Sequence, residues 1–284
     1  MATTTTTITR TFYGAELQTA QLLGIPYVTD AKGTLNARFN VLPNEVMPDD
    51  KYPSLVGFTI GFGGHDHTTG TDGTPLTSEK PHLMTDVANY KPLPFVARNI
   101  NDDLTPQEKA KYGIRVLFSG NDSNTYALYY VRLINKTGVT TKKEIHTKNS
   151  DGTTTISAFT PGDENLVPVA PELSSEGINV LAAKDGVVTA PITLHLTKQE
   201  IREIIDAALV LYGDDRYAQI SEIGMITGLF KNITLANQEV FREIVFAQTA
   251  AFAAAAYQLR HITTEFTAVF DSGVSGPLLK VVTA

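Results

Sequence analysis

The stretch Ile220-Ser221-Glu222-Ile223-Gly224-Met225-Ile226-Thr227-Gly228 decides the fold, because it has the pattern of a strand. A capped helix precedes this strand, and a segment that is apolar on all sides, Ala250 to Ala256, follows it. We expect both flanking elements to need partners that cover them. Nothing between them supplies catalytic chemistry, so this order is typical of a building block rather than of an enzyme.

The helix before this strand has the clearest signals in the sequence. Thr197 and Glu200 form a capping box, in which each side chain satisfies an otherwise free amide. Gly213 is expected to end the helix. One apolar stripe runs along it, formed by Ile201, Ile204, Ile205, Ala208 and Leu209.

The region after the strand is predicted to contain a long helix from about Leu235 to Leu259. It carries polar residues up to Thr249 and then becomes apolar all round. Small side chains such as Ala254 predict close contact on more than one side. Alternation from Ile262 to Phe270 predicts a further strand, which a turn at Asp271-Ser272-Gly273 ends.

Two hairpins are predicted in the middle of the chain. Residues 114–118 and 126–134 flank a Gly-Asn-Asp-Ser-Asn turn. Residues 142–146 and 153–159 flank a turn that contains Asp-Gly, which favours a type I′ hairpin. A Pro- and Gly-rich crossing loop is expected at 161–177.

The first hundred residues are predicted to be less regular. Residues 1–12 are rich in threonine and have no apolar face, so we expect an extended arm that contacts another chain. A short helix is expected at 15–23 and a pair of strands at 26–39. Residues 40–100 are proline-punctuated and loop-dominated, and only 54–62 has a clean strand pattern.

Composition limits the possible functions. Charged residues make up 19% of the chain and the formal net charge is -7, which disfavours nucleic acid as a general partner. The absence of cysteine excludes disulfides, thiolate metal sites and cysteine nucleophiles. The start of the sequence lacks the apolar core of a signal peptide, and the apolar run from Ala250 to Tyr257 is too short to span a bilayer. The lysines Lys142, Lys143 and Lys148 are expected on a solvated hairpin.

The sharpest metal-like signal is His65-Asp66-His67 in a glycine-rich loop. Two imidazoles at i and i+2 on an extended strand can bind one ion, with His82 or Asp86 as a third ligand. No HExxH spacing is present, and we favour an incidental role for both histidines. Gly61-Phe62-Gly63-Gly64 has the glycine content of a phosphate loop but lacks a following Lys-Ser or Lys-Thr.

Paired carboxylates at Asp102-Asp103 and Asp214-Asp215 do not form acid–base couples by themselves, because adjacent side chains point in different directions. We interpret them as solvated residues near helix ends. Thr105 and Glu108 predict a second, short capped helix. No Gly-x-Ser-x-Gly sequence is present to seat a hydrolase nucleophile. We therefore assign no catalytic, cofactor-binding or metal-binding residue.

The segment Ile220-Ser221-Glu222-Ile223-Gly224-Met225 resembles a strand that recurs in virion proteins of tailed bacteriophages. The surrounding order, from the capped helix to Pro277-Leu278-Leu279, is also similar, so the resemblance covers about residues 190–280. The chain lacks the repeated glycine-rich shaft that tail fibres have. The resemblance implies a non-enzymatic part of the neck, collar or baseplate of a contractile-tailed particle.

The expected fold is α+β: an antiparallel β core with a few packed helices, long loops and an extended N-terminal arm over 1–12. Residues 13–284 are expected to form one structural domain, with a possible subdivision near 161–190. The leading hypothesis is a virion protein that assembles in the host cytoplasm with copies of itself and other virion proteins, without nucleic acid, membrane or cofactor. The alternatives are a carbohydrate- or surface-binding β module that uses loops 61–90, and a metal-dependent enzyme centred on His65 and His67.

Overall fold

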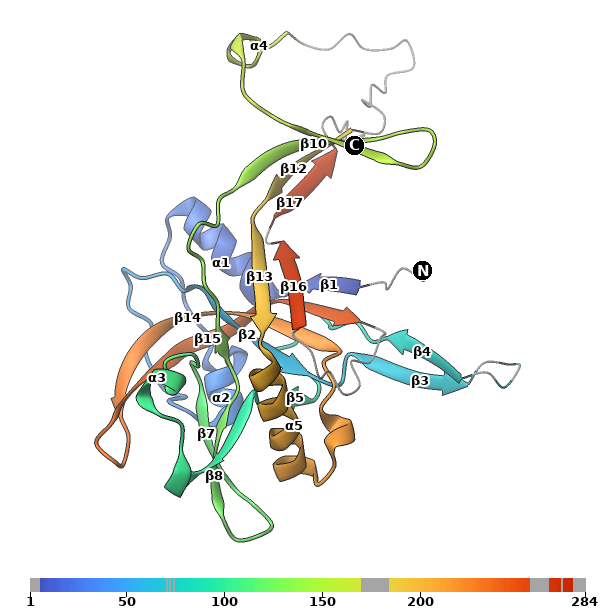
Figure 1. The fold of residues 1–284 in the computed structure, drawn as a ribbon. Coiled ribbons are helices and arrows are strands. Elements are labelled where there is room, and N and C mark those ends of the chain that lie inside the picture. Colours follow the sequence, from blue (N-terminus) through green and yellow to red (C-terminus); the bar gives the residue numbers. More distant parts are fainter. Residues whose placement is uncertain are drawn as a thin grey trace. The chain divides into compact units, whose positions relative to one another are not determined.

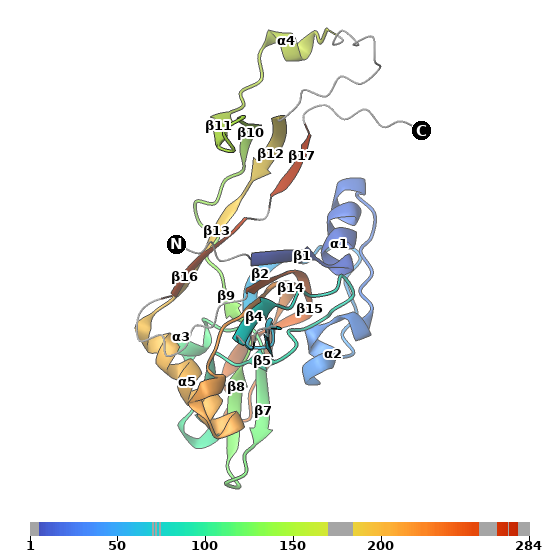
Figure 2. The same ribbon diagram turned by 90° about the vertical axis from the view of Figure 1, so that its right-hand side faces the viewer.

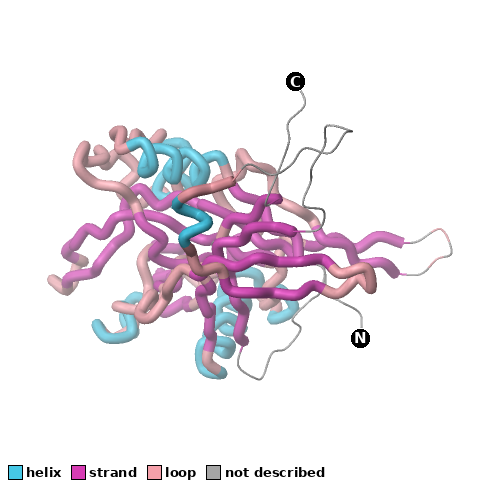
Figure 3. Tube along the Cα trace, turned by 90° about the horizontal axis from the view of Figure 1, so that it is seen from above, coloured by secondary structure: helices cyan, strands magenta, loops and turns pink. Residues whose placement is uncertain are grey.

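A computed structural model describes residues 6–69, 71, 73, 75–169, 184–255, 266–271 and 273–277. Strands in several antiparallel sheets dominate this part of the chain, with short helices between them (Figure 3). The predicted α+β class with an antiparallel core is therefore confirmed. The chain forms two compact units, Met1–Ile134 with Leu196–Phe266 and Asn135–His195 with Thr267–Ala284. These boundaries lie outside the expected 161–190.

The first unit contains a 6-stranded antiparallel sheet (Figure 1). Its order is β1, β15, β14, β2 and β5, and β9 also pairs with β2. The bounds are Thr6–Arg10 (β1), Val240–Ala255 (β15), Glu222–Thr234 (β14), Ser54–Gly61 (β2), Pro92–Leu93 (β5) and Arg132–Leu133 (β9). β14 lies between β15 and β2 and pairs with both. The strands predicted at 220–228 and 54–62 are thus confirmed, and the structure places β14 at the centre of the sheet.

The long helix predicted from Leu235 to Leu259 is wrong, because β15 occupies most of this segment. A tight turn joins β14 to β15, in which the Leu235 amide donates to the Glu239 carbonyl at 2.8 Å. Both faces of β15 are largely covered, so its residues from Glu243 onward are mostly buried without the alternation of a half-exposed strand. The tertiary pairing with two neighbouring strands overrides the helix preference of alanine.

Two irregularities interrupt the pairing of β15 with β14. At the first, Phe246 has a φ of 55°, and Asn36 holds the chain by donating to the Ile244 carbonyl and accepting from the Ala247 amide. At the second, Ala250 has no partner on β14, and its carbonyl accepts from the Thr11 amide instead. The bulges therefore provide the backbone groups to which the N-terminal helices are attached.

The extended arm expected over 1–12 is not supported. Residues 1–5 lie outside the described chain, while β1 pairs along β15 of the same molecule. Thr11 then caps α1, which spans Phe12–Leu23 and confirms the predicted helix, with Gly24 at its C-terminal end. The β-branched residues 6–10 thus pair within the sheet of their own chain.

The pair of strands predicted at 26–39 is also wrong. This segment contains the 3-10 helix η1 (Ala31–Gly33) and the α-helix α2 (Leu35–Phe39). The Asp30 side chain accepts from the Lys32 amide, and the Thr34 side chain accepts from the Ala37 amide. These two side chains satisfy amides at helix starts, so the turn residues begin helices instead of joining strands.

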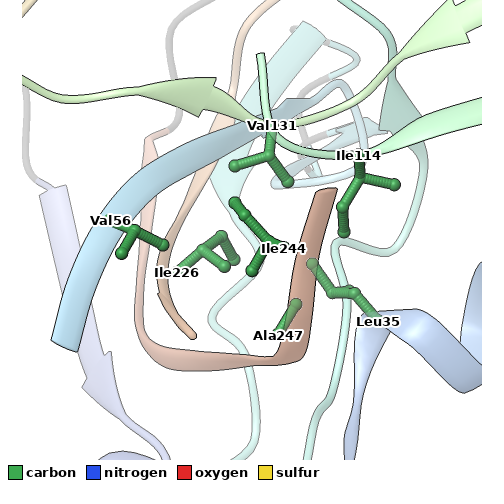
Figure 4. Close-up of a cluster of buried hydrophobic side chains, with 7 residues drawn as sticks. All are labelled: Leu35, Val56, Ile114, Val131, Ile226, Ile244 and Ala247. Atoms are coloured by element: carbon green, nitrogen blue, oxygen red, sulfur yellow. The ribbon is translucent and has the colours of Figure 1, made fainter. Parts of the chain in front are cut away.

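A hydrophobic cluster lies where α2 meets the large sheet (Figure 4). Its fully buried members come from α2, from three sheet strands and from the segments beside β7 and β9: Leu35, Val56, Ile114, Val131, Ile226, Ile244 and Ala247. Each aliphatic side chain buried in this way contributes about 1.5–3 kcal/mol. This core fixes the sheet beneath the candidate site.

A 3-stranded antiparallel sheet completes the core of the first unit. Its order is β6 (Val96–Asn99), β8 (Thr125–Tyr129) and β7 (Arg115–Ser119), which confirms the hairpin predicted around 114–134. Helix α5 (Lys198–Tyr212) packs Ala207 against Leu128 and Tyr130, on the side of the unit away from α1 and α2 (Figure 2). Its predicted capping box is present, but Leu209, assigned to the apolar stripe, is exposed.

The remaining elements of the first unit are short. Helix α3 (Pro106–Lys109) has the capping box predicted from Thr105 and Glu108. The 3-10 helices are η2 (Ile100–Asp102) and η3 (Asp215–Tyr217). In the region expected to be loops, β3 (His65–Thr69) and β4 (Pro75–Glu79) pair as a hairpin.

The second unit contains a 4-stranded sheet in the order β11, β10, β12 and β17. Their bounds are Thr154–Ala158, Lys142–Lys148, Lys184–Thr189 and Val274–Pro277. The predicted hairpin of β10 and β11 is confirmed. A short helix α4 (Asp163–Leu166) follows it in the expected crossing loop, and β13 (Pro191–Leu196) pairs with β16 (Phe266–Asp271). The sequence did not indicate β12 or β13, and residues 262–265 of the predicted last strand lie outside the described part.

Candidate functional site

The carboxylate of Glu222, at the start of β14, is fully buried, accepts three backbone hydrogen bonds and contacts one imidazole. Its Oε1 accepts from the amides of Gly63 at 2.9 Å and Lys91 at 3.0 Å. Its Oε2 accepts from the amide of Tyr90 at 3.0 Å and lies 2.7 Å from Nε2 of His82. A single side chain of the central strand therefore holds two loops that are far apart in sequence.

His82 connects Glu222 to a second carboxylate. Its Nδ1 lies 2.9 Å from Oδ2 of Asp86. The imidazole is stacked between the rings of Tyr90 and Phe252, with centroids 4.1 Å and 3.7 Å away. Its two nitrogens face different carboxylates, so the three side chains form a chain of polar contacts that runs from the fully buried Glu222 through His82 to the partly exposed Asp86.

Burial by itself would raise the pKa of Glu222. The contact with His82 and the hydrogen bonds from the amides of Lys91, Gly63 and Tyr90 outweigh it and hold the pKa below its usual value. Glu222 is therefore ionised at neutral pH. A buried carboxylate with this number of donors stabilises the loops that surround it.

The glycine-rich segment after β2 passes directly over Glu222. A Cβ atom on Gly61 would lie 2.4 Å from Glu222 Oε1, and a Cβ on Gly64 would lie 2.2 Å from the Ser221 carbonyl oxygen. These glycines permit close approach of two backbones, which explains the run that resembles a phosphate loop only in composition.

A cleft of about 500 Å³ opens beside this network, within the first unit. We call it the Tyr90 cleft. Aromatic, cationic and hydrogen-bonding side chains line it: Phe62, His65, Asp66, Lys80, Tyr90, Lys91, Arg216, Tyr217 and Gln219, with Gly63. Its walls come from the segment after β2, the β3–β4 hairpin, the loop before β5 and η3.

Two lysines of the Tyr90 cleft rest on its aromatic rings. Nζ of Lys80 lies 5.3 Å from the ring centroid of Tyr90, and Nζ of Lys91 lies 5.3 Å from that of Phe62. Arg216 is exposed and pairs with Asp214 through its Nε at 2.7 Å. The cleft thus concentrates positive charge in a chain whose formal net charge is -7.

The structure separates the residues considered as metal ligands. His65 lies in the Tyr90 cleft, and the side chain of His67 lies outside the described part. His82 and Asp86, the expected third ligands, contact each other, and His82 also contacts Glu222. Among the described residues, no group of three His, Cys, Asp or Glu side chains is arranged to hold a metal ion.

The paired carboxylates have different environments. Asp214 accepts from the Arg216 amide and caps η3, as expected. Asp103 was expected to be solvated, but its side chain is only 10% exposed and contacts Arg115 at 2.9 Å and the Tyr129 hydroxyl at 2.7 Å. Burial alone would raise the pKa of Asp103. The contacts with the Tyr129 hydroxyl and with Arg115 outweigh burial and help to lower this pKa. Nζ of Lys109 also contacts Asp103 at 3.3 Å and Glu239 at 2.6 Å, which extends this ion network.

Glu243 on β15 is a second buried carboxylate, in a very different setting from Glu222. Neither of its oxygens makes a well-formed hydrogen bond. Burial raises its pKa to about 8, and Arg115, through its amide and its charge, offsets only part of that effect. The side chain is therefore mostly protonated at neutral pH.

In the sequence, Glu222 is recognisable only as part of the strand at 220–228. The available signal was a charged residue in an otherwise apolar central strand, since buried glutamates are almost always paired. Its partners could not be found, because they lie 131 to 159 residues away in sequence. Phe62, Lys80 and Tyr90 fall within the loops 61–90 that were considered for ligand binding.

A model of a family of unknown function, DUF7208, matches residues 1–284. The chain belongs to the DUF7208 family. No curated protein and no solved structure is significantly similar to this DUF7208 chain. Within the described residues of the DUF7208 chain, no helix combines the length and apolar character needed to cross a membrane.

Proposed function

We propose that this chain is a non-enzymatic structural subunit of a tailed-bacteriophage virion, which assembles with copies of itself and with other virion proteins in a neck or baseplate. An exposed apolar surface at the end of α1 carries the assembly part of this proposal. The resemblance of residues 190–280 to virion proteins carries the choice of particle. Of the elements that carry that resemblance, the capped helix and the strand with Glu222 are present as α5 and β14, whereas the long alanine-rich helix that was expected to follow them is the strand β15.

The apolar surface consists of five large aliphatic side chains, which we call the α1 patch. Leu22, Leu23, Ile25 and Val28 lie within seven residues and are 87%, 64%, 48% and 76% exposed. Val46, the fifth, is 85% exposed.

Two contacts bring the chain around Val46 close to the end of α1. The Tyr52 hydroxyl donates to the carbonyl of Ile25 at 2.6 Å. Met47, next to Val46 in sequence, packs on the cluster of Leu17, Ala20 and Tyr27 beneath α1. Single exposed aliphatic residues are ordinary, whereas a group of this size marks a surface that a partner covers. The low fraction of charged residues, 19%, also favours association.

We expect the full-length chain to form oligomers whose population rises with protein concentration. Replacing Leu22 and Val28 together by Glu should shift the equilibrium towards monomers at least tenfold, because it places two charges in the contact. Leu117→Glu, at a 55% exposed position on β7, is the matched control. Mass photometry and light scattering over a concentration series measure the effect. A parent chain that stays monomeric, or an equal effect of Leu117→Glu, would contradict self-assembly through this patch.

The virion part of the proposal needs a separate test. Particles released by a host that encodes this chain should contain it after banding in a density gradient, and antibodies against it should label the neck or baseplate in electron micrographs. Recovery of the chain only in the soluble host fraction would exclude a virion role.

A further inference from the structure

We propose that the Tyr90 cleft is a binding site for an acidic saccharide, a sugar chain that carries carboxylate groups. This inference is independent of the proposed assembly, because the cleft and the α1 patch have no residue in common. A volume of about 500 Å³ lies within the range of about 300–1,000 Å³ that is typical of ligand sites, and it exceeds the size of a single inorganic anion.

The charges in the cleft favour an anionic ligand. Lys80, Lys91 and Arg216 line the cleft together with Asp66, and because Arg216 is paired with Asp214, the two lysines supply the positive charge that is left for a ligand. The two lysines rest on aromatic rings through cation–π contacts, which contribute only about 0.5–1 kcal/mol at exposed positions. A ligand carboxylate forms a stronger, charge-assisted hydrogen bond, so it can draw these flexible ammonium groups from the rings.

Removing a lysine from its ring also uncovers an apolar surface. The Tyr90 ring is fixed on its other face by stacking on His82. Phe62 is held by edge contacts with Tyr212 and Tyr217, whose centroids lie 5.3 Å and 5.4 Å away. The rings are thus pre-positioned platforms for the apolar face of a sugar ring, while the displaced lysines bind its carboxylates.

Asp66 and Gln219 distinguish a saccharide from a nucleic acid or a polyphosphate. Both line the same cleft and have groups that hydrogen-bond sugar hydroxyls. A carboxylate beside the bound ligand can accept hydrogen bonds from sugar hydroxyls, whereas the phosphates of a polyphosphate or a DNA backbone offer it no donor. One charge per sugar, separated by hydroxyl groups, matches this mixed lining better than a continuous phosphate backbone.

The test uses the full-length chain and trigalacturonate as the probe, with isothermal titration calorimetry at low and moderate ionic strength. We expect binding to weaken with salt, since exposed charges are screened. The fully methyl-esterified trisaccharide has the same shape without the charges, and it should bind at least tenfold more weakly.

Two double variants locate the site. Lys80→Met with Lys91→Met keeps most of both apolar stems and should raise the Kd for trigalacturonate at least tenfold. Lys142→Met with Lys143→Met removes the same charge from β10 in the second unit and should leave the Kd unchanged. Thermal melting of each variant checks that the fold is retained, and Tyr217→Leu, which should weaken binding without altering any charge, is a second probe of the cleft.

Four results would overturn the proposal. The first is no heat of binding at millimolar trigalacturonate, and the second is equal affinity for the methyl ester. The third is an equal loss of trigalacturonate affinity in both lysine double variants. The fourth is tighter binding of inorganic phosphate or of a short oligothymidylate than of the trisaccharide. The last result would assign the cleft to phosphate chemistry instead.

Discussion

Glu222 and Glu243 lie on adjacent strands and are both fully buried, yet their pKa values move in opposite directions. Glu222 accepts hydrogen bonds from three amides and contacts His82, whereas Glu243 makes no well-formed hydrogen bond. The number of hydrogen-bond donors that reach each carboxylate decides whether its pKa is lowered or raised. Burial alone raises the pKa of a carboxyl group, and donors to its charged form reverse this effect.

Glu222→Gln should destabilise the protein by about 3 kcal/mol. The side-chain amide of Gln places an N–H donor against the backbone amides that now donate to the carboxylate. Because the pKa of Glu222 is lowered on folding, its stabilising contribution is present above the ordinary pKa of a glutamate and is lost as the pH falls through the lowered value. Urea unfolding at pH 7 measures the loss. An equally small effect of Glu222→Gln and of the exposed control Glu16→Gln would show that the network contributes little.

Glu243→Gln should have the opposite dependence on pH. The folded protein keeps the Glu243 proton up to about pH 8, while the unfolded chain releases it at an ordinary glutamate pKa, so wild-type stability falls as the pH rises between these values. The unfolding free energy of the glutamine variant does not fall with pH in this way. The difference in unfolding free energy between the variant and the parent should therefore grow in favour of the variant by an amount on the order of 4 kcal/mol between pH 5 and pH 9. Unfolding free energies at several pH values test this, and parallel curves for the two proteins would contradict it.

At the scale of elements, β15 explains both the successes and the failures of the sequence analysis. The β2 strand and the two hairpins were predicted correctly because turn residues and local alternation specify them. β15 was predicted as a helix because an apolar run without alternation fits a buried helix as well as a buried strand. Only its pairing with β1 and β14, which the sequence does not reveal, decides between the two.

Ala254 on β15 tests the close packing of this strand. It lies opposite Glu222 on β14, so both side chains point to the same face of the sheet, where Phe252 also stacks on His82. Ala254→Leu should destabilise the fold by about 1–3 kcal/mol, since no room exists for three more carbon atoms. Ala254→Ser should be milder. Ala253→Leu, on the opposite face and only partly buried, is the control, and thermal or urea unfolding of all three variants measures the difference. An Ala254→Leu variant as stable as the parent would mean that this face is loosely packed.

At the scale of the whole molecule, the sequence was sufficient for the class of fold but not for the site. Antiparallel strands with short helices follow from local patterns, whereas the Tyr90 cleft combines residues from 62 to 219. His65 was selected for its spacing from His67, but the structure places it beside Lys80 and Tyr90, which carry no spacing signal. The cleft depends on Glu222 holding both loops, and that arrangement becomes visible only in three dimensions.

The bulges of β15 also constrain the order in which the protein folds. Asn36 bonds to the amide of Ala247, 211 residues away, and Thr11 bonds to the carbonyl of Thr249, 238 residues away. During synthesis, α1 and α2 must therefore wait for β15 to leave the ribosome before they can dock. Contacts of such long range slow folding and leave strand edges uncovered in the meantime. The docking of α1 and α2 on the sheet is thus a late step, which takes place only when most of the chain has been made.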